Sequence, residues 1–141
     1  MNPTKLALRN VRILHAVFLL TMFLYIVVLR LIKTPEHAVP TGIVLVFALV
    51  AFSDVGIALF IRSRKVRASE EKLRTQPNDP GALNQWRVGM ITSCVLAETI
   101  ALLGFVLRIL GAEWKLAGAF FAFAVLLMLL WMPRLDLAEA R

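Results

Sequence analysis

Cysteine, histidine and tyrosine are scarce in this 141-residue chain, which has one Cys, two His and one Tyr. The single cysteine, Cys94, excludes an intrachain disulfide and a thiol pair that could bind a metal. The histidines, His15 and His37, are expected on opposite sides of a membrane, so no Ser/His/Asp triad can form. No glycine-rich phosphate loop and no metal-ligand spacing is visible. We therefore expect neither an enzyme nor a bound cofactor or metal.

Charged residues are also few, at 18% of the chain, and they stand between apolar runs, while 60% of the residues are apolar. A soluble domain of this length cannot bury so much apolar surface, so the sequence predicts an integral membrane protein. The net charge of +7 could suggest nucleic acid, but the basic residues flank the apolar runs and indicate membrane topology instead. The expected partner is a lipid bilayer, with no nucleic acid.

Four apolar runs have about the ~20 residues that a helix needs to cross the hydrocarbon layer. They cover about 13–32, 41–61, 88–110 and 116–132. Short links at Lys33–Pro40 and Gly111–Lys115 favour antiparallel neighbours. The predicted fold class is an all-α membrane protein, with four transmembrane helices as two antiparallel hairpins, in one domain of residues 1–141 with a cytoplasmic loop at 62–87.

The orientation follows from the basic residues. Twelve of the sixteen Lys and Arg residues lie at the amino end, in the loop 62–87 or in the tail. The positive-inside rule then predicts a multi-pass protein of the plasma (inner) membrane with both termini cytoplasmic. Trp86, Trp114 and Trp131 fall at or beside predicted span ends and are expected to anchor the helices at the interfaces.

Four basic residues follow the second run and lie at the level of the lipid headgroups: Arg62, Arg64, Lys65 and Arg67. A basic residue near an anionic surface contributes roughly 1 kcal/mol, so we expect these four to contact anionic lipid. Arg108 stands ten residues beyond Glu98, too far along a helix to pair with it. We expect Arg108 to reach the outer surface as an anchor.

Two acids interrupt the apolar runs, and a charge at the centre of a membrane helix costs roughly 2.5–3.5 kcal/mol. Asp54 is eight residues from Arg62, or ~12 Å of helix, and Glu98 is eleven from Arg87, or ~16 Å. Their similar depth allows the two carboxyl groups to face each other across one helix contact. The functional hypothesis is that Glu98 binds a proton or small cation, with Asp54 assisting.

Small residues surround these acids. A ridge at four-residue spacing on the third run predicts a helix-packing seam: Gly89, Ser93, Ala97 and Ala101. Gly118 and Ala122 on the fourth run offer a mate for it. These small neighbours support a second interpretation, in which each acid is protonated and only joins helices by hydrogen bonds worth roughly 0.6 kcal/mol. Both interpretations stay open.

Residues 74–107 resemble part of a known family. The segment Ala97–Leu107, in which Gly104 and an aliphatic run follow Glu98, is similar to the carboxylate helix of the proteolipid c subunits of rotary ATP synthases. Arg74–Pro77 resembles the polar loop between the two helices of that family. The resemblance implies that Glu98 is an ion-binding carboxylate.

The sequence therefore predicts a small membrane protein that works as a homo-oligomer or with other membrane subunits, with a carboxylate that binds a proton or cation. One alternative is a purely structural or assembly subunit, whose membrane acids only pack helices. A further alternative is a small-molecule exporter of the small multidrug type, which also uses one membrane glutamate.

Overall fold

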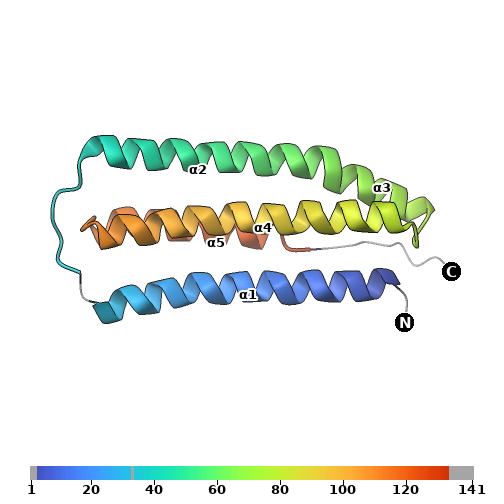
Figure 1. Cartoon of the computed structure of the whole chain (residues 1–141), viewed down its shortest axis with the longest axis horizontal. Coiled ribbons are helices and arrows are strands. Elements are labelled where there is room, and N and C mark those ends of the chain that lie inside the picture. Colours follow the sequence, from blue (N-terminus) through green and yellow to red (C-terminus); the bar gives the residue numbers. More distant parts are fainter. Residues whose placement is uncertain (1–2, 33, 134–141) are drawn as a thin grey trace.

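The computed structural model describes residues 3–32 and 34–133, and within them it contains helices and no strands. The elements in order are α1 Pro3–Ile32, α2 Thr41–Ile61, the π-helical turn η1 Arg62–Val66, α3 Arg67–Thr75, α4 Pro80–Ile109 and α5 Trp114–Leu130. The helices lie alongside one another, and α2, η1 and α3 form one continuous rod (Figure 1). The all-α prediction is confirmed.

Three helical segments are long and apolar enough to cross a membrane: α1, the rod from Thr41 to Thr75, and α4. The fourth, α5, is apolar but shorter. Many large apolar side chains on the outside of the bundle are exposed, including Leu20, Phe52 and Leu130. A surface of this kind suits lipid and not water.

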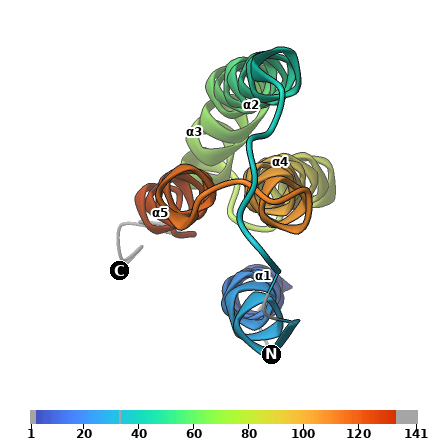
Figure 2. The same cartoon turned by 90° about the vertical axis from the view of Figure 1, so that its left-hand side faces the viewer.

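The helix α4 occupies the centre of the bundle. Seen from one end, α1, α2 and α5 surround it (Figure 2), and it packs against all three. Its direction is parallel to α1 and antiparallel to α2 and α5 (Figure 1). The core between these helices is built from side chains such as Met22, Ile100, Phe121 and Met128, all of them buried.

The first predicted hairpin is not a packed pair, which corrects the expectation of two hairpins. Within the described residues α1 and α2 make no packing contact, because α4 lies between them (Figure 2). The extended link 34–40 can span roughly 23 Å, more than twice the 8–10 Å between packed helix axes. Its His37 N–H donates to Gly111 O at 3.0 Å, so the link crosses over the turn that joins α4 to α5. The hairpin of α4 with α5 is present.

Two helices continue beyond the predicted spans. α1 begins at Pro3 and α4 at Pro80, and their first turns meet α3 around a second buried cluster. Trp86 lies fully buried in this cluster, and its indole N–H donates to Glu70 at 3.3 Å. Trp86 is therefore a core residue, and the expectation that it anchors an interface is wrong.

The π-helical turn shifts the register of the rod. Ala51 and Ala58, seven residues apart, face the core, and continuing that spacing would bring Lys65 to the buried side. The turn adds one residue, so Val66 is buried in its place, followed by Ser69 and Leu73. The rod thus buries an apolar residue while Lys65 stays exposed.

Local sequence explains where α4 begins and ends. Asp79 caps its start by accepting the Ala82 N–H at 2.8 Å, and Pro80 stands at the first helical position. Gly111 follows its end with φ at 97°, a conformation that favours glycine. Lys33, Arg134 and Arg141, which belong to the charge count above, lie outside the described residues.

Candidate functional site

Glu98 lies on the side of α4 that faces α1. Its Oε1 accepts a hydrogen bond of 3.1 Å from the hydroxyl of Tyr25, and the side chain is half-buried. The Tyr25 ring packs on Phe105, with centroids 5.2 Å apart and planes tilted by 45°. The only tyrosine of the chain is thus held by one aromatic contact and bonded to the only acid of α4.

Tyr25 was missed from the sequence, although a signal was present. It is the single tyrosine and lies inside the apolar run 13–32. A hydroxyl at membrane depth needs a hydrogen-bond partner, so its position pointed to a polar group on a neighbouring helix.

A second polar pair lies one helical turn along the same interface. Cys94, four residues before Glu98, places its Sγ 3.5 Å from Nδ1 of His15, and both residues are buried. Residues four apart share one face of a helix, so both pairs join α1 to α4. His15 is therefore a packed core residue next to a thiol.

Asp54 does not join Glu98. Glu98 and Gly89 are nine residues apart, which turns them to opposite sides of α4, and Gly89 faces Val66 and Ile61 of the α2–η1 rod. Glu98 faces α1, whereas Asp54 belongs to α2 on the other side of α4. The facing carboxyl pair that similar depth allows is not formed. Among the described residues, Asp54 Oδ2 is buried and has no hydrogen-bond partner.

The predicted seam lies inside the bundle, because all four of its residues are buried: Gly89, Ser93, Ala97 and Ala101. The packing partner on α5 is not the expected pair, Gly118 with Ala122. No atom lies within 4 Å of a Cβ placed on Gly118, whereas Gly104 lies against the backbone of Ala117 and the Cβ of Phe120. The close approach of α4 to α5 therefore uses Gly104, outside the predicted ridge.

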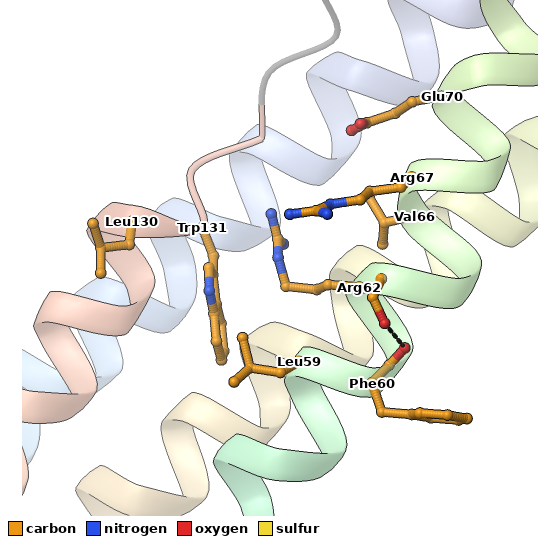
Figure 3. Close-up of a pocket in the computed structure, with 9 residues that line it drawn as sticks. Leu59, Phe60, Arg62, Val66, Arg67, Glu70, Leu130 and Trp131 are labelled. Carbon is orange, nitrogen blue, oxygen red and sulfur yellow. Dashed lines mark hydrogen bonds between the residues drawn. The ribbon is translucent and has the colours of Figure 1, made fainter.

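The basic residues after α2 separate into two groups. Arg62 and Arg67 line a groove of about 590 Å³ between the rod and the end of α5 (Figure 3), whereas Arg64 and Lys65 do not. The Arg62 guanidinium stacks 5.5 Å from the centre of the Trp131 ring and donates to the Met90 sulfur at 3.3 Å.

Arg108 is buried, so its predicted role as a surface anchor is wrong. Its guanidinium donates to Ala112 O and to Thr34 O, each at 2.8 Å, and lies 3.8 Å from the Glu36 carboxylate. It also lies 5.0 Å from the centre of the Trp114 ring. Arg108 thus ties the link 34–40 to the α4–α5 turn, because the loop carbonyls are nearer than solvent.

None of these sites has the donor set of a metal centre. In residues 3–32 and 34–133, no three His, Cys, Asp or Glu side chains lie close enough together to bind one ion. The geometry provides a phenol–carboxylate hydrogen bond at Glu98 and a cation–aromatic contact at Arg62, next to which Arg67 lines the same groove.

Comparisons with protein-family models, with curated proteins and with solved structures found no match to this chain. The resemblance of residues 74–107 to proteolipid c subunits therefore stays a prediction. The roles of the sites rest on their geometry.

Proposed function

We propose that all four helices cross the membrane, with both termini and the α2–α4 connection on the cytoplasmic side of the plasma membrane. Two layers of arginine and tryptophan support this. Arg62 stacks on Trp131 at one end of the bundle, and Arg30 stacks on Trp114 at the other, 4.5 Å from its ring centre. From Trp114 to Trp131 the helix rises ~26 Å, close to the ~30 Å hydrocarbon core. α5 thus reaches from one interface to the other despite its length.

The protein is further proposed to bind a proton at Glu98. Along α4, Glu98 lies eight residues from Met90, in the Arg62 layer, and ten from Arg108, in the opposite layer. The carboxyl group is therefore near mid-membrane, where an acid is a functional candidate. The observation that carries the proposal is the Tyr25–Glu98 hydrogen bond. A phenol can donate to a carboxylate and accept from a carboxylic acid, so the pair suits both protonation states.

A proton is favoured over a metal cation. Hard cations take about six or more oxygen ligands, and the described contacts of Glu98 provide one phenol. The geometry does not support a role for Asp54 in this site, because Glu98 faces α1 whereas Asp54 lies on α2, on the opposite side of α4. The grooves at the two ends of the bundle are lined by neither acid, so no observation favours the exporter alternative.

We also propose that the protein associates with a second copy of itself, and that Glu98 works within this oligomer. α5 presents Gly118 and Ala122, four residues apart, in a groove of about 590 Å³ shared with α1. Small residues at this spacing let another transmembrane helix approach closely. The structural alternative is favoured by the same Tyr25–Glu98 bond, because that bond also holds α1 on α4.

Carbodiimide labelling distinguishes proton binding from packing, because the reagent modifies protonated carboxyl groups. The purified protein in detergent is labelled with dicyclohexylcarbodiimide across pH. We expect labelling that disappears at high pH, is abolished by Glu98→Gln and persists in Asp54→Asn.

Tyr25→Phe provides the matched control, since it removes one hydroxyl and keeps the ring on Phe105. It should leave labelling intact and still dependent on pH, because the Glu98 carboxyl group stays in place. Labelling that ignores pH, or that survives Glu98→Gln, would refute the proton site. Helical structure must be unchanged in each variant, as checked by circular dichroism.

A further inference from the structure

The groove beside η1 combines charge with apolar walls. Leu59, Phe60 and Leu130 form its membrane side, and the arginines and Glu70 form the other side. In Figure 3 the guanidinium groups of Arg62 and Arg67 reach toward each other between Glu70 and Trp131. A site with one apolar end and one cationic end suits an amphiphile.

The positive charge of this groove is only partly neutralised within the described chain. Neither Arg62 nor Arg67 forms an ion pair there, because the two described pairs are Lys72 with Asp79 and Arg108 with Glu36. Glu70 is the only acid in the groove lining and also accepts the Trp86 indole N–H. Two guanidinium groups against one carboxylate leave a net positive site.

The donors of Arg62 are poorly used. The described acceptor of this half-buried side chain is the Met90 sulfur, and a thioether is a weak acceptor. A guanidinium has five N–H donors in a fork that matches phosphate oxygens. The unused donors of Arg62 therefore point to an anionic ligand.

The level of the groove identifies the source of that anion. Arg62 directly follows the 21 residues of α2, most of them apolar, and Trp131 directly follows α5. At this depth the phosphates of lipid headgroups stand beside the chain, and tryptophan is enriched there. We propose that Arg62 and Arg67 bind the phosphate of one anionic phospholipid, whose acyl chains lie along Leu59 and Leu130.

Only two of the four basic residues take part, because the other two lie elsewhere. Arg64 stacks over Phe60 at 5.6 Å, and the Lys65 side chain begins beside Gly89. Both are outside the groove lining, whereas Arg67, which is also exposed, is part of it. The general contact with anionic lipid predicted for all four residues is thus narrowed to one site formed by two of them.

The test compares two double variants that remove equal charge from the same helical segment. Arg62→Gln/Arg67→Gln removes the site, and Arg64→Gln/Lys65→Gln is the matched control. Each protein is purified in neutral detergent and titrated with phosphatidylglycerol, and the bound lipid is counted by native mass spectrometry. At ~1 kcal/mol per basic residue, the first variant should bind the lipid about 30-fold more weakly, whereas the control should stay within about threefold.

Two wild-type measurements keep the proposal refutable if a variant does not fold. Inorganic phosphate at millimolar concentration should leave the lipid bound, and displacement by phosphate would overturn the lipid in favour of a soluble phosphate ligand. If phosphatidylcholine bound as tightly as phosphatidylglycerol, the site would not be specific for anionic lipid and the proposal would be overturned. Equal losses of lipid affinity in the two double variants would overturn it as well. The proposal rests on the membrane placement above, which is tested separately by flotation of the wild-type protein with neutral vesicles.

Discussion

At Gly104 the backbone of α4 lies directly against α5, six residues beyond Glu98. A Cβ placed there would stand 2.8 Å from Phe120 Cβ and 3.0 Å from Ala117 O. Carbon atoms prefer roughly 3.5–4.0 Å, so Gly104→Ala creates an overlap of up to about 1 Å. The opposing atoms belong to the backbone or its first side-chain carbon, so no rotamer change relieves it and α5 must move.

The expected cost follows from two opposing terms. Overpacking costs about 1–3 kcal/mol, whereas alanine in a helix is favoured over glycine by about 1 kcal/mol. Gly56 on α2 provides the control, because nothing lies within 4 Å of a Cβ placed there. Gly56→Ala should be neutral or slightly stabilising, and Gly104→Ala should be less stable than it by about 2 kcal/mol, or ~30-fold in the folded-to-unfolded ratio.

The assay is reversible unfolding in mixed micelles of a mild detergent and sodium dodecyl sulfate, followed by far-ultraviolet circular dichroism. A third glycine, Gly89, tests whether an overlap with the end of a side chain can be relieved by shortening that side chain. A Cβ on Gly89 would meet Val66 Cγ2 at 2.7 Å, a side-chain end that Val66→Ala removes. Gly89→Ala should therefore cost little in a Val66→Ala background. Equal stability of Gly104→Ala and Gly56→Ala would refute the packing argument.

Two further predictions concern the ends of the bundle. Arg108→Gln should destabilise the protein by about 3 kcal/mol in the same assay, because two loop carbonyls lose a charged donor; a loss below 0.5 kcal/mol would show that the guanidinium only fills space. Lys72 Nζ, 2.7 Å from the Asp79 carboxylate, and a helix N–H hold the pKa of Asp79 below its ordinary value. The native state thus favours the ionised form, so its contribution to stability is complete above the unfolded pKa of about 3.9 and is lost as pH falls through the lower native value. Asp79→Asn, which keeps the helix cap, should flatten stability against pH in this acid range, and an unchanged acid limb would contradict the assignment.

Much of the fold could be predicted because the length of an apolar run limits a membrane helix directly. The ends of α2 coincide with the predicted run 41–61, and Pro40 stands at its start as expected from the missing N–H of proline. The position of α1 could not be predicted in this way. A link that is short in residues is long in distance when extended, so α1 packs beside α4 and not beside α2.

The candidate site was predictable only in part. The cost of a membrane charge singled out Glu98, but its partner Tyr25 is 73 residues away and belongs to a helix whose neighbour was not known. Depth alone brought Asp54 and Glu98 together in the prediction, because depth says nothing about rotation around a helix axis. Trp86 was misassigned for a related reason: the apolar run of α4 begins later than the helix, so a core position resembled an interface.

The extra residue of η1 makes the chain unequally tolerant of changes in length. Removing one residue between Arg62 and Val66 would place Val66 seven residues after Ala58, on the same face of an unbroken α-helix, whereas adding one residue there would rotate α3 by about 100° relative to α2. With the added residue, Val66 and Leu73 would leave the core together, and Arg67 would leave the groove that it shares with Arg62. One residue added to the link 34–40 after His37, beyond the hydrogen bonds of Thr34 and His37, would leave every helix in register. Insertions should therefore be accepted at one end of the bundle and excluded at the other.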